Sequence, residues 1–154
     1  MRLLDAGLHL LGTVGARGCS TRAAEEATEL PHGSVRHHFG GWDSFLDALV
    51  DRLLELEDPR PEEGVADTLA RWLGPGIVQT RARYELTLMA LRHEPLRRKI
   101  VDGRERYVAA TAVAAVLDQH AARQVVAALD GLVLDAVLRR SATVDASALA
   151  RLLG

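Results

Sequence analysis

Residues 20–41 read STRAAEEATELPHGSVRHHFGG, and the caps and breakers in this segment place two short helices next to each other. Ser20 and Thr21 are N-cap residues for a helix that ends before Pro31, because the residue preceding a proline disfavours helical backbone. The next residues, 32–39, reach a double glycine and hold two helical turns at most. The segment therefore predicts two short helices separated by a tight turn.

Apolar residues recur at helical spacing on both sides of this segment, which predicts an all-α chain. Leu and Ala supply 25 and 24 of the 154 residues, whereas Ile occurs twice and aromatic residues make up 4%. Helix formers thus outnumber strand formers. The expected helices span about residues 3–14, 21–29, 32–39, 42–57, 65–73, 77–94, 96–117, 121–140 and 145–153.

The apolar stripes also predict which helix faces are buried. Residues 121–140 carry too many apolar side chains for one stripe, so this helix needs two apolar partners. The proline-rich run at 58–61 breaks the chain, and we expect a domain boundary there. The faces expected to be buried on the helices of residues 77–94 and 96–117 carry Ile77, Tyr84, Leu88 and Leu91, and Ile100, Tyr107, Thr111 and Ala114, respectively.

Charge and cysteine content exclude several classes of protein. The chain has 19 basic and 21 acidic residues, a net charge of −2, so no overall charge favours nucleic acid or a membrane surface. Cys19 is the single cysteine, which excludes an internal disulfide and a multi-cysteine metal centre. No apolar run approaches the length of a membrane span, and no cleavable leader is visible, so we expect a cytoplasmic protein.

The segment 21–41 closely resembles the N-terminal signature of the TetR family of bacterial regulators. Residues 3–11, Leu-Leu-Asp-Ala-Gly-Leu-His-Leu-Leu, resemble the first helix of that family. The similarity at the level of motifs covers about residues 2–54. Beyond them the chain is compatible with the family in helix count, in helix lengths and in the doubly apolar helix near the C-terminus.

The resemblance implies an all-α, TetR-like fold. Residues 1–57 would form a helix-turn-helix DNA-binding domain, and residues 58–154 a ligand-binding and dimerisation domain. The helices at 121–140 and 145–153 would build the interface of a homodimer. Family members bind operator DNA as repressors and respond to a small-molecule effector, so the resemblance implies a transcriptional regulator, without cofactor or metal, that is not an enzyme.

The resemblance also implies a set of DNA-contacting residues. Gly33 would let the backbone approach DNA, and Ser34, Arg36 and His37 would face base edges or phosphates. Thr21 would cap the second helix and offer its hydroxyl or amide to a phosphate. Counted together, the expected DNA-binding residues are Thr21, Arg22, His32, Gly33, Ser34, Arg36, His37 and His38.

Four positions depart from the family pattern. Arg36 stands where members usually have Tyr, and Trp42 where they have Lys. Glu25 stands at a packed helix junction that prefers a small residue, and Glu29 at a turn that prefers Gly, where a non-Gly residue costs about 1 kcal/mol. A carboxylate at such a junction is costly unless it escapes to water, so we expect the second helix to be rotated or displaced.

The C-terminal domain offers side chains for an effector cavity. Its large or polar residues at helical spacing serve equally as plain core, and the scarcity of aromatics predicts a largely aliphatic cavity for an apolar or amphipathic ligand with one polar handle. The expected ligand-binding residues are Trp72, Tyr84, Met89, His93, Arg104 and Tyr107.

Two other functions compete with a DNA-binding regulator. Residues 1–57 carry 5 Arg against 9 acidic residues, a net charge of −4, which favours a TetR-like dimer that binds a ligand or a partner and has weak or lost DNA binding. The weakest hypotheses are a metal site on His32, His37 and His38, and an enzyme, such as a hydrolase, built on Ser34 beside His37. Adjacent residues on a helix point about 100° apart, and no nucleophile, base and orienting group occur together.

Overall fold

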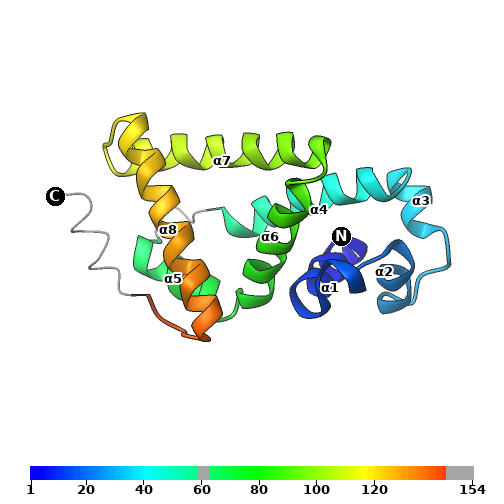
Figure 1. The fold of residues 1–154 in the computed structure, drawn as a ribbon. Coiled ribbons are helices and arrows are strands. Elements are labelled where there is room, and N and C mark those ends of the chain that lie inside the picture. Colours follow the sequence, from blue (N-terminus) through cyan, green and yellow to red (C-terminus); the bar gives the residue numbers. More distant parts are fainter. Residues whose placement is uncertain (59–62, 145–154) are drawn as a thin grey trace. The chain divides into compact units, whose positions relative to one another are not determined.

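The computed structural model describes residues 1–58 and 63–144, which form helices and no strand (Figure 1). The prediction of an all-α chain is confirmed. The helix expected at 145–153 lies outside the described residues. In chain order the helices are α1 (Arg2–Gly18), α2 (Thr21–Ala27), α3 (Ser34–Phe39), α4 (Trp42–Glu57), α5 (Val65–Leu73), α6 (Ile77–Ala90), α7 (Glu94–Ala114) and α8 (Gln119–Arg139).

Contacts divide the chain into two compact units, which are described separately. The first unit comprises residues 1–58 and 76–100, and the second comprises the described parts of 59–75 and 101–154. Helix α6 therefore packs with α1 and α4, although it follows the proline-rich break at 58–61 in the sequence. None of the helices described is both long and apolar enough to cross a bilayer.

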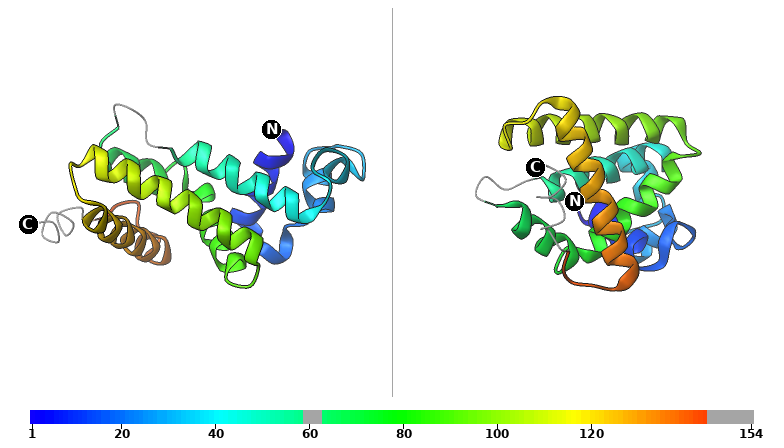
Figure 2. Two further views of the ribbon diagram at one scale, coloured as in Figure 1. Left: turned by 90° about the horizontal axis from the view of Figure 1, so that it is seen from above. Right: turned by 60° about the vertical axis from the view of Figure 1, so that its left-hand side comes forward.

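The first unit has one apolar core, built mainly by α1 and α4. Phe45 and Leu49 of α4 are fully buried, and Leu11 of α1 is 1% exposed. Val35 of α3 and Leu86 of α6 are also completely buried, so both the short helix and the later one contribute to the same core. Figure 2 shows the ribbon of these helices from two further directions. This core fixes where the exposed side of α3 lies on the unit.

Helices α1 and α6 meet at backbone distance. A Cβ atom built on Gly12 would lie 2.0 Å from the carbonyl oxygen of Val78, so only glycine fits there. Three residues later, Gly15 leaves helical geometry with φ 75° and ψ 179°, and α1 continues to Gly18. The break frees the N–H of Ala16, which donates to Glu85 Oε2 of α6 at 3.1 Å.

The close approach also selects the buried face of α6, and here the sequence prediction is wrong. Leu88 and Leu91, expected inside, are 56% and 70% exposed, whereas Ile77 and Tyr84 are half-buried. Small side chains permit helices to approach closely, whereas bulky ones would hold them apart. The buried residues of α6 are Thr80, Ala82, Leu86 and Ala90.

In the second unit, α8 packs against α5 and buries one stripe of apolar side chains. The buried residues of the stripe are Ala122, Val126, Leu129, Val133 and Ala136. A small cluster joins α8 to α7 through Val108, with Tyr107 packed beside it. The predicted face of α7 is partly wrong, because Ile100, Tyr107 and Thr111 are half-buried but Ala114 is exposed.

Two helix ends in the second unit adopt left-handed backbone at non-glycine residues. Val116 has φ 55° after α7, and Leu117 donates its N–H to the carbonyl of Ala112 at 2.9 Å. Arg140 has φ 56° after α8, and Ser141 makes the equivalent bond to Ala136. These bonds satisfy the last carbonyls of each helix. They also end α7 at Ala114, before the expected position near 117.

We expect Gly12→Ala to destabilise the protein by about 3 kcal/mol, because the new methyl group must push α1 away from the backbone of α6. Urea unfolding followed by circular dichroism measures the free energy of unfolding.

Gly131→Ala is the matched control. Gly131 also lies inside a helix, but a Cβ there meets nothing within 4 Å. Alanine should stabilise this site by roughly 0.5–1 kcal/mol, since glycine is a poor helix former. Equal effects of the two substitutions would contradict the close contact between α1 and α6.

Candidate nucleic-acid interface

Helix α2 is capped by Ser20. Its backbone is extended, with φ −146° and ψ 166°, and its Oγ accepts a hydrogen bond from the N–H of Ala23 at 3.1 Å. Thr21 is the first helical residue, so the prediction that Thr21 caps this helix is wrong. The reason is geometric, because an N-cap residue needs non-helical backbone. Thr21 stays half-buried at the start of α2.

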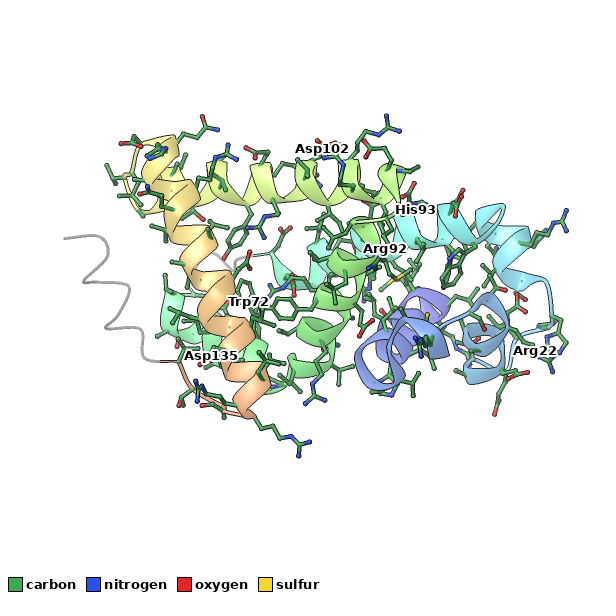
Figure 3. All side chains as sticks on the ribbon, in the orientation of Figure 1. Arg22, Trp72, Arg92, His93, Asp102 and Asp135 are labelled. Atoms are coloured by element: carbon green, nitrogen blue, oxygen red, sulfur yellow. The ribbon has the colours of Figure 1, made fainter. Side chains whose placement is uncertain are left out.

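Arg22 is exposed on α2, and its charge is paired. Its side chain is 75% exposed and lies at the surface (Figure 3), where Nε donates to Glu26 Oε1 at 2.7 Å. This hydrogen bond raises the pKa of Arg22. The four-residue spacing of Arg22 and Glu26 on one helix was enough to predict this pair from the sequence. An approaching phosphate must compete with Glu26 for Arg22.

The turn after α2 forms without glycine. Glu29 adopts φ 56°, its N–H donates to the carbonyl of Glu26, and the N–H of Leu30 donates to the carbonyl of Glu25 at 3.0 Å. The guanidinium of Arg2 on α1 donates to the carbonyl of Thr28 at 2.9 Å. These bonds close the turn, and the left-handed backbone at Glu29 is the strain predicted for a non-glycine residue at this position.

The side chain of Glu25 is buried and hydrogen-bonded, which the sequence did not predict. Its side chain is 5% exposed, Oε1 accepts from the N–H of Val35 at 2.9 Å, and Oε2 accepts from the N–H of Gly33 at 3.1 Å. The carboxylate does not escape to water, and Ala24 beside it is fully buried in the core. The carboxylate instead satisfies N–H groups at the start of α3.

The charged form of Glu25 is stabilised by its surroundings. The N–H of Val35 is the main cause that lowers the pKa of Glu25, burial opposes it, and the N–H of Gly33 and the nearby His32 lower it further. His32 Nδ1 lies 3.6 Å from Glu25 Oε2, and the His32 side chain is 70% exposed. A single carboxylate thus connects α2, the turn and α3.

The remaining predicted DNA contacts lie on α3 or directly before it. Arg36, His37 and His38 are exposed, and the rings of the two histidines meet edge to face with centroids 5.0 Å apart. Gly33 has φ 91°, and a Cβ there would meet nothing within 4 Å, so its backbone is open to an approaching molecule. Ser34 is half-buried and donates its hydroxyl to the carbonyl of Pro31 at 2.6 Å.

Aromatic packing anchors the end of α3 and the start of α4. The ring of Phe39 lies 5.2 Å from the ring of Phe45, and Trp42 lies 6.0 Å from the same ring. Both outer rings are half-buried. Trp42 therefore packs where the family pattern has a cationic Lys, and this position adds no positive charge to the exposed side.

Two of the five arginines of residues 1–57, Arg22 and Arg52, are paired with carboxylates of the same unit. Arg52 contacts Asp5 at 2.8 Å and Glu55 at 3.2 Å, in addition to the pairing of Arg22 with Glu26. Within the described part of the chain, the guanidinium of Arg36 makes no hydrogen bond or ion pair, and the residue is bonded only through its backbone, whose carbonyl accepts from the N–H of Gly40 at 2.9 Å. Arg36 is thus the cation that α3 can present to an anion.

Three of the expected ligand-binding residues lie in the second unit. Trp72 of α5 is 5% exposed (Figure 3), and its ring lies 6.2 Å from the ring of Tyr107 of α7. Arg104 forms an ion pair with Asp130 of α8. The structure brings Trp72 and Tyr107 together, and it places Arg104 on a partly exposed part of the same unit.

The other three lie in the first unit. The guanidinium of Arg83 lies over the ring of Tyr84, 5.3 Å from its centroid. His93 connects two helices, because Nε2 lies 3.3 Å from Asp43 Oδ1 of α4 and Nδ1 accepts from the N–H of Leu96 in α7. This arrangement gives His93 a packing role at the start of α7.

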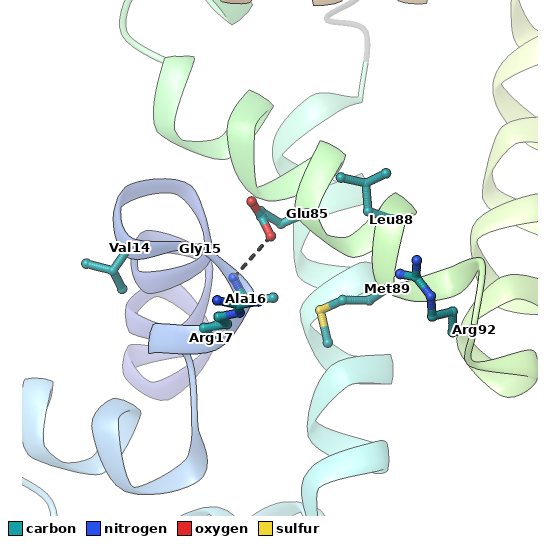
Figure 4. Close-up of a pocket in the computed structure, with 8 residues that line it drawn as sticks. All are labelled: Val14, Gly15, Ala16, Arg17, Glu85, Leu88, Met89 and Arg92. Atoms are coloured by element: carbon teal, nitrogen blue, oxygen red, sulfur yellow. Dashed lines mark hydrogen bonds between the residues drawn. The ribbon is translucent and has the colours of Figure 1, made fainter.

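Met89 lines a groove of about 400 Å³ between the end of α1 and α6 (Figure 4). Sequence analysis missed the other lining residues, because they come from helices far apart in the chain. No cluster of three or more metal-ligating side chains occurs among the residues that the structure describes. The groove residues are Val14, Gly15, Ala16, Arg17, Glu85, Leu88, Met89 and Arg92.

Comparison with known proteins identifies the family. Residues 60–154 match the family model "Tetracyclin repressor-like, C-terminal domain". No curated protein matches the sequence of the chain. Together with the helix-turn-helix geometry of α2 and α3, the match shows that this chain belongs to the TetR family of regulators.

Solved structures agree with this assignment. A TetR-family member from Streptomyces coelicolor A3, SCO1917, is 30% identical, with a TM-score of 0.79 over 99% of this chain and 94% of that chain. The multidrug binding protein EbrR complexed with ethidium is 30% identical, with a TM-score of 0.75 over 99% and 94%. EbrR complexed with imidazole is 28% identical, with a TM-score of 0.76 over 99% and 90%.

The lowered pKa of Glu25 predicts a pH-dependent contribution to stability. The charged carboxylate stabilises the fold above the ordinary Glu pKa of about 4.3, and this contribution disappears as the pH falls through the lower pKa of the folded state. Glu25→Gln should lower the melting temperature by about 5 °C at pH 7, and the difference from wild type should shrink on acidification to pH ~3.

Glu26→Gln is the control, since Glu26 is the exposed neighbour and carries the same charge. Thermal melts at pH 7 and at low pH measure both variants. If the effect of Glu25→Gln is the same at the two pH values, the carboxylate does not act through its charge.

Proposed function

We propose that this protein is a ligand-responsive transcriptional repressor that binds operator DNA as a homodimer through α2 and α3. A small molecule bound by the C-terminal domain modulates or releases the complex. In this proposal the protein works in the cytoplasm of a bacterium, as a regulator without cofactor and not as an enzyme. The observation that carries it is the compact pair α2 and α3, held by Glu25 with Arg36 exposed.

The DNA contacts follow from what α3 exposes. Arg36 carries a charge without an internal partner in the described chain, and His37 and His38 offer ring nitrogens to phosphates or base edges. The open backbone at Gly33 allows close approach. Thr21 and Arg22 at the start of α2, together with His32 and Ser34, complete the proposed set.

The effector proposal rests on the family and on the aromatic pair in the second unit. The EbrR structures are complexes with ethidium and imidazole, which are organic molecules with nitrogen-containing rings. Buried Trp72 beside Tyr107 supplies apolar ring surface of the kind that lines ligand cavities. We propose an apolar or amphipathic effector with one polar group, bound against Trp72 and Tyr107, with Arg104 of the same unit as a further contact. Tyr84, Met89 and His93 are proposed as ligand contacts within the first unit.

The dimer proposal rests on the second apolar face of α8. Leu134 is 40% exposed and Leu138 is 74% exposed, outside the stripe that α8 buries in its own unit. Apolar surface of this kind marks sites of association. A second copy of the same helix covers it in the proposed dimer, in which residues 121–140 and 145–153 form the interface.

A second candidate function is a TetR-like dimer that binds a ligand or a partner and has weak or lost DNA binding. The net charge of −4 over residues 1–57 and the pairing of Arg22 with Glu26 favour it. Duplex affinity depends on how many phosphates are neutralised, so each internally paired arginine weakens binding. The strength of binding to operator DNA separates the two functions.

We expect Arg36→Ala to weaken binding to DNA that flanks the gene by about tenfold or more, and to lower the slope of log affinity against log salt by about one unit. Mobility-shift titrations at two salt concentrations measure both quantities.

Arg81→Ala is the matched control, because Arg81 is an exposed arginine of α6 in the same unit. It should leave the affinity nearly unchanged. Wild-type protein that binds flanking and random DNA equally would favour the second candidate function.

Light scattering should give about twice the chain mass of 16.7 kDa. Leu138→Asp should produce monomers at micromolar concentration, because it places a charge in the apolar contact between the two copies. Leu91→Asp is the control, since Leu91 is 70% exposed on the first unit. A wild-type monomer at these concentrations would contradict the dimer.

A further inference from the structure

The start of α3 has little backbone left for an anion. The N–H groups of Gly33 and Val35 donate to Glu25, and the N–H of Ser34 donates to the carbonyl of Pro31 at 3.1 Å. Helix N-termini commonly hold phosphates through such N–H groups. In this protein a side chain from α2 occupies two of those donors, and the turn occupies the third.

Glu25 is also placed where it can control the orientation of α3. The helix has six residues, and its apolar contacts are made by Val35, which is buried, and by Phe39 at its far end, so little apolar surface holds its first turn in place. Helices this short are not stable without tertiary contacts. The two hydrogen bonds from Gly33 and Val35 to one carboxylate fix the first turn of α3 in both direction and rotation relative to α2.

We propose that Glu25 is a positioning residue for DNA recognition, which sets α3 on α2 with a buried carboxylate that takes the place of a DNA phosphate at the start of α3. This inference rests on the proposed DNA-binding function. DNA is then held by side chains of α3 and by the start of α2. Of the two exposed arginines among them, Arg22 is paired with Glu26, and Arg36 has no carboxylate partner.

Replacing Glu25 and replacing its neighbour Glu26 should change the affinity for DNA in opposite directions, and this difference tests the inference. Glu25 and Glu26 are adjacent residues of α2 with the same charge, but Glu26 is exposed and Glu25 is buried. If only charge matters, removing either carboxylate raises the affinity for DNA, since the protein becomes less repulsive to phosphates. If Glu25 positions α3, its removal lowers the affinity although a negative charge is lost.

The experiment compares wild type, Glu25→Gln and Glu26→Gln in mobility-shift titrations. The probes are duplexes from the DNA flanking the gene and a random duplex of the same length. We expect Glu26→Gln to bind the flanking DNA at least as tightly as wild type, and Glu25→Gln to bind it at least tenfold more weakly. Binding to the random duplex, which depends on charge, should not fall in either variant.

A second variant and a measurement without DNA separate positioning from folding. Glu25→Asp keeps the charge but has a shorter side chain, so it cannot reach both N–H groups, and it should also bind the flanking DNA more weakly. Hydrogen exchange of the Gly33 and Val35 amides should become at least tenfold faster in Glu25→Gln, while amides of the α1 core keep their protection. All titrations are made at temperatures at which melting curves show each variant folded.

The outcomes are distinct. Equal or tighter binding of flanking DNA by Glu25→Gln, or unchanged exchange at Gly33 and Val35, overturns the inference. Wild-type protein that does not distinguish flanking from random DNA overturns the proposed function instead. Hydrogen exchange at Gly33 and Val35 still shows whether Glu25 holds the start of α3. The failure of this inference can therefore be distinguished from the failure of the proposed function.

Discussion

A buried carboxylate joins α2 to α3 through two backbone N–H groups, and the exposed side of α3 depends on this contact. Glu25 stands where a small residue is usual, so its burial looks unfavourable until its partners are counted. A buried charge is tolerated when it is hydrogen-bonded, and this carboxylate accepts a bond at each oxygen. Around it, Gly33 supplies the left-handed backbone that turns the chain into α3. Without this link, the first turn of α3 would be held by Val35, while Phe39 anchors only its other end.

The helices were predictable wherever local signals define them. Pro31, the double glycine after α3, and Ser20 before α2 act over a few residues, and the structure begins or ends helices within a few positions of each. Which face of α6 is buried was not predictable in the same way. That face is set by the approach of Gly12 to Val78, a contact between residues far apart in the sequence. The spacing of apolar residues predicts an apolar stripe on α6, but it does not predict how closely α1 approaches that helix.

In the candidate interface, too, features set by local sequence were predictable, and features set by contacts between residues far apart were not. The exposure of Arg36 and His37 follows from a short polar segment between two breakers, and sequence was sufficient for it. The role of Glu25 was not readable, because its hydrogen-bond donors lie eight and ten residues away and depend on the turn. The pairing of Arg22 with Glu26 was readable from spacing alone and reduces the charge that α2 presents.

Three non-glycine residues of the described chain adopt left-handed backbone, and relieving the strain at them is a way to raise the thermal stability of the protein. They are Glu29, Val116 and Arg140. Each residue occupies a helix end that glycine adopts with less strain, and each side chain projects into solvent. The fold therefore carries local strain at surface turns, away from the helix faces that build its cores. Thermal tolerance can rise at those turns while the recognition surface and the packing stay as they are.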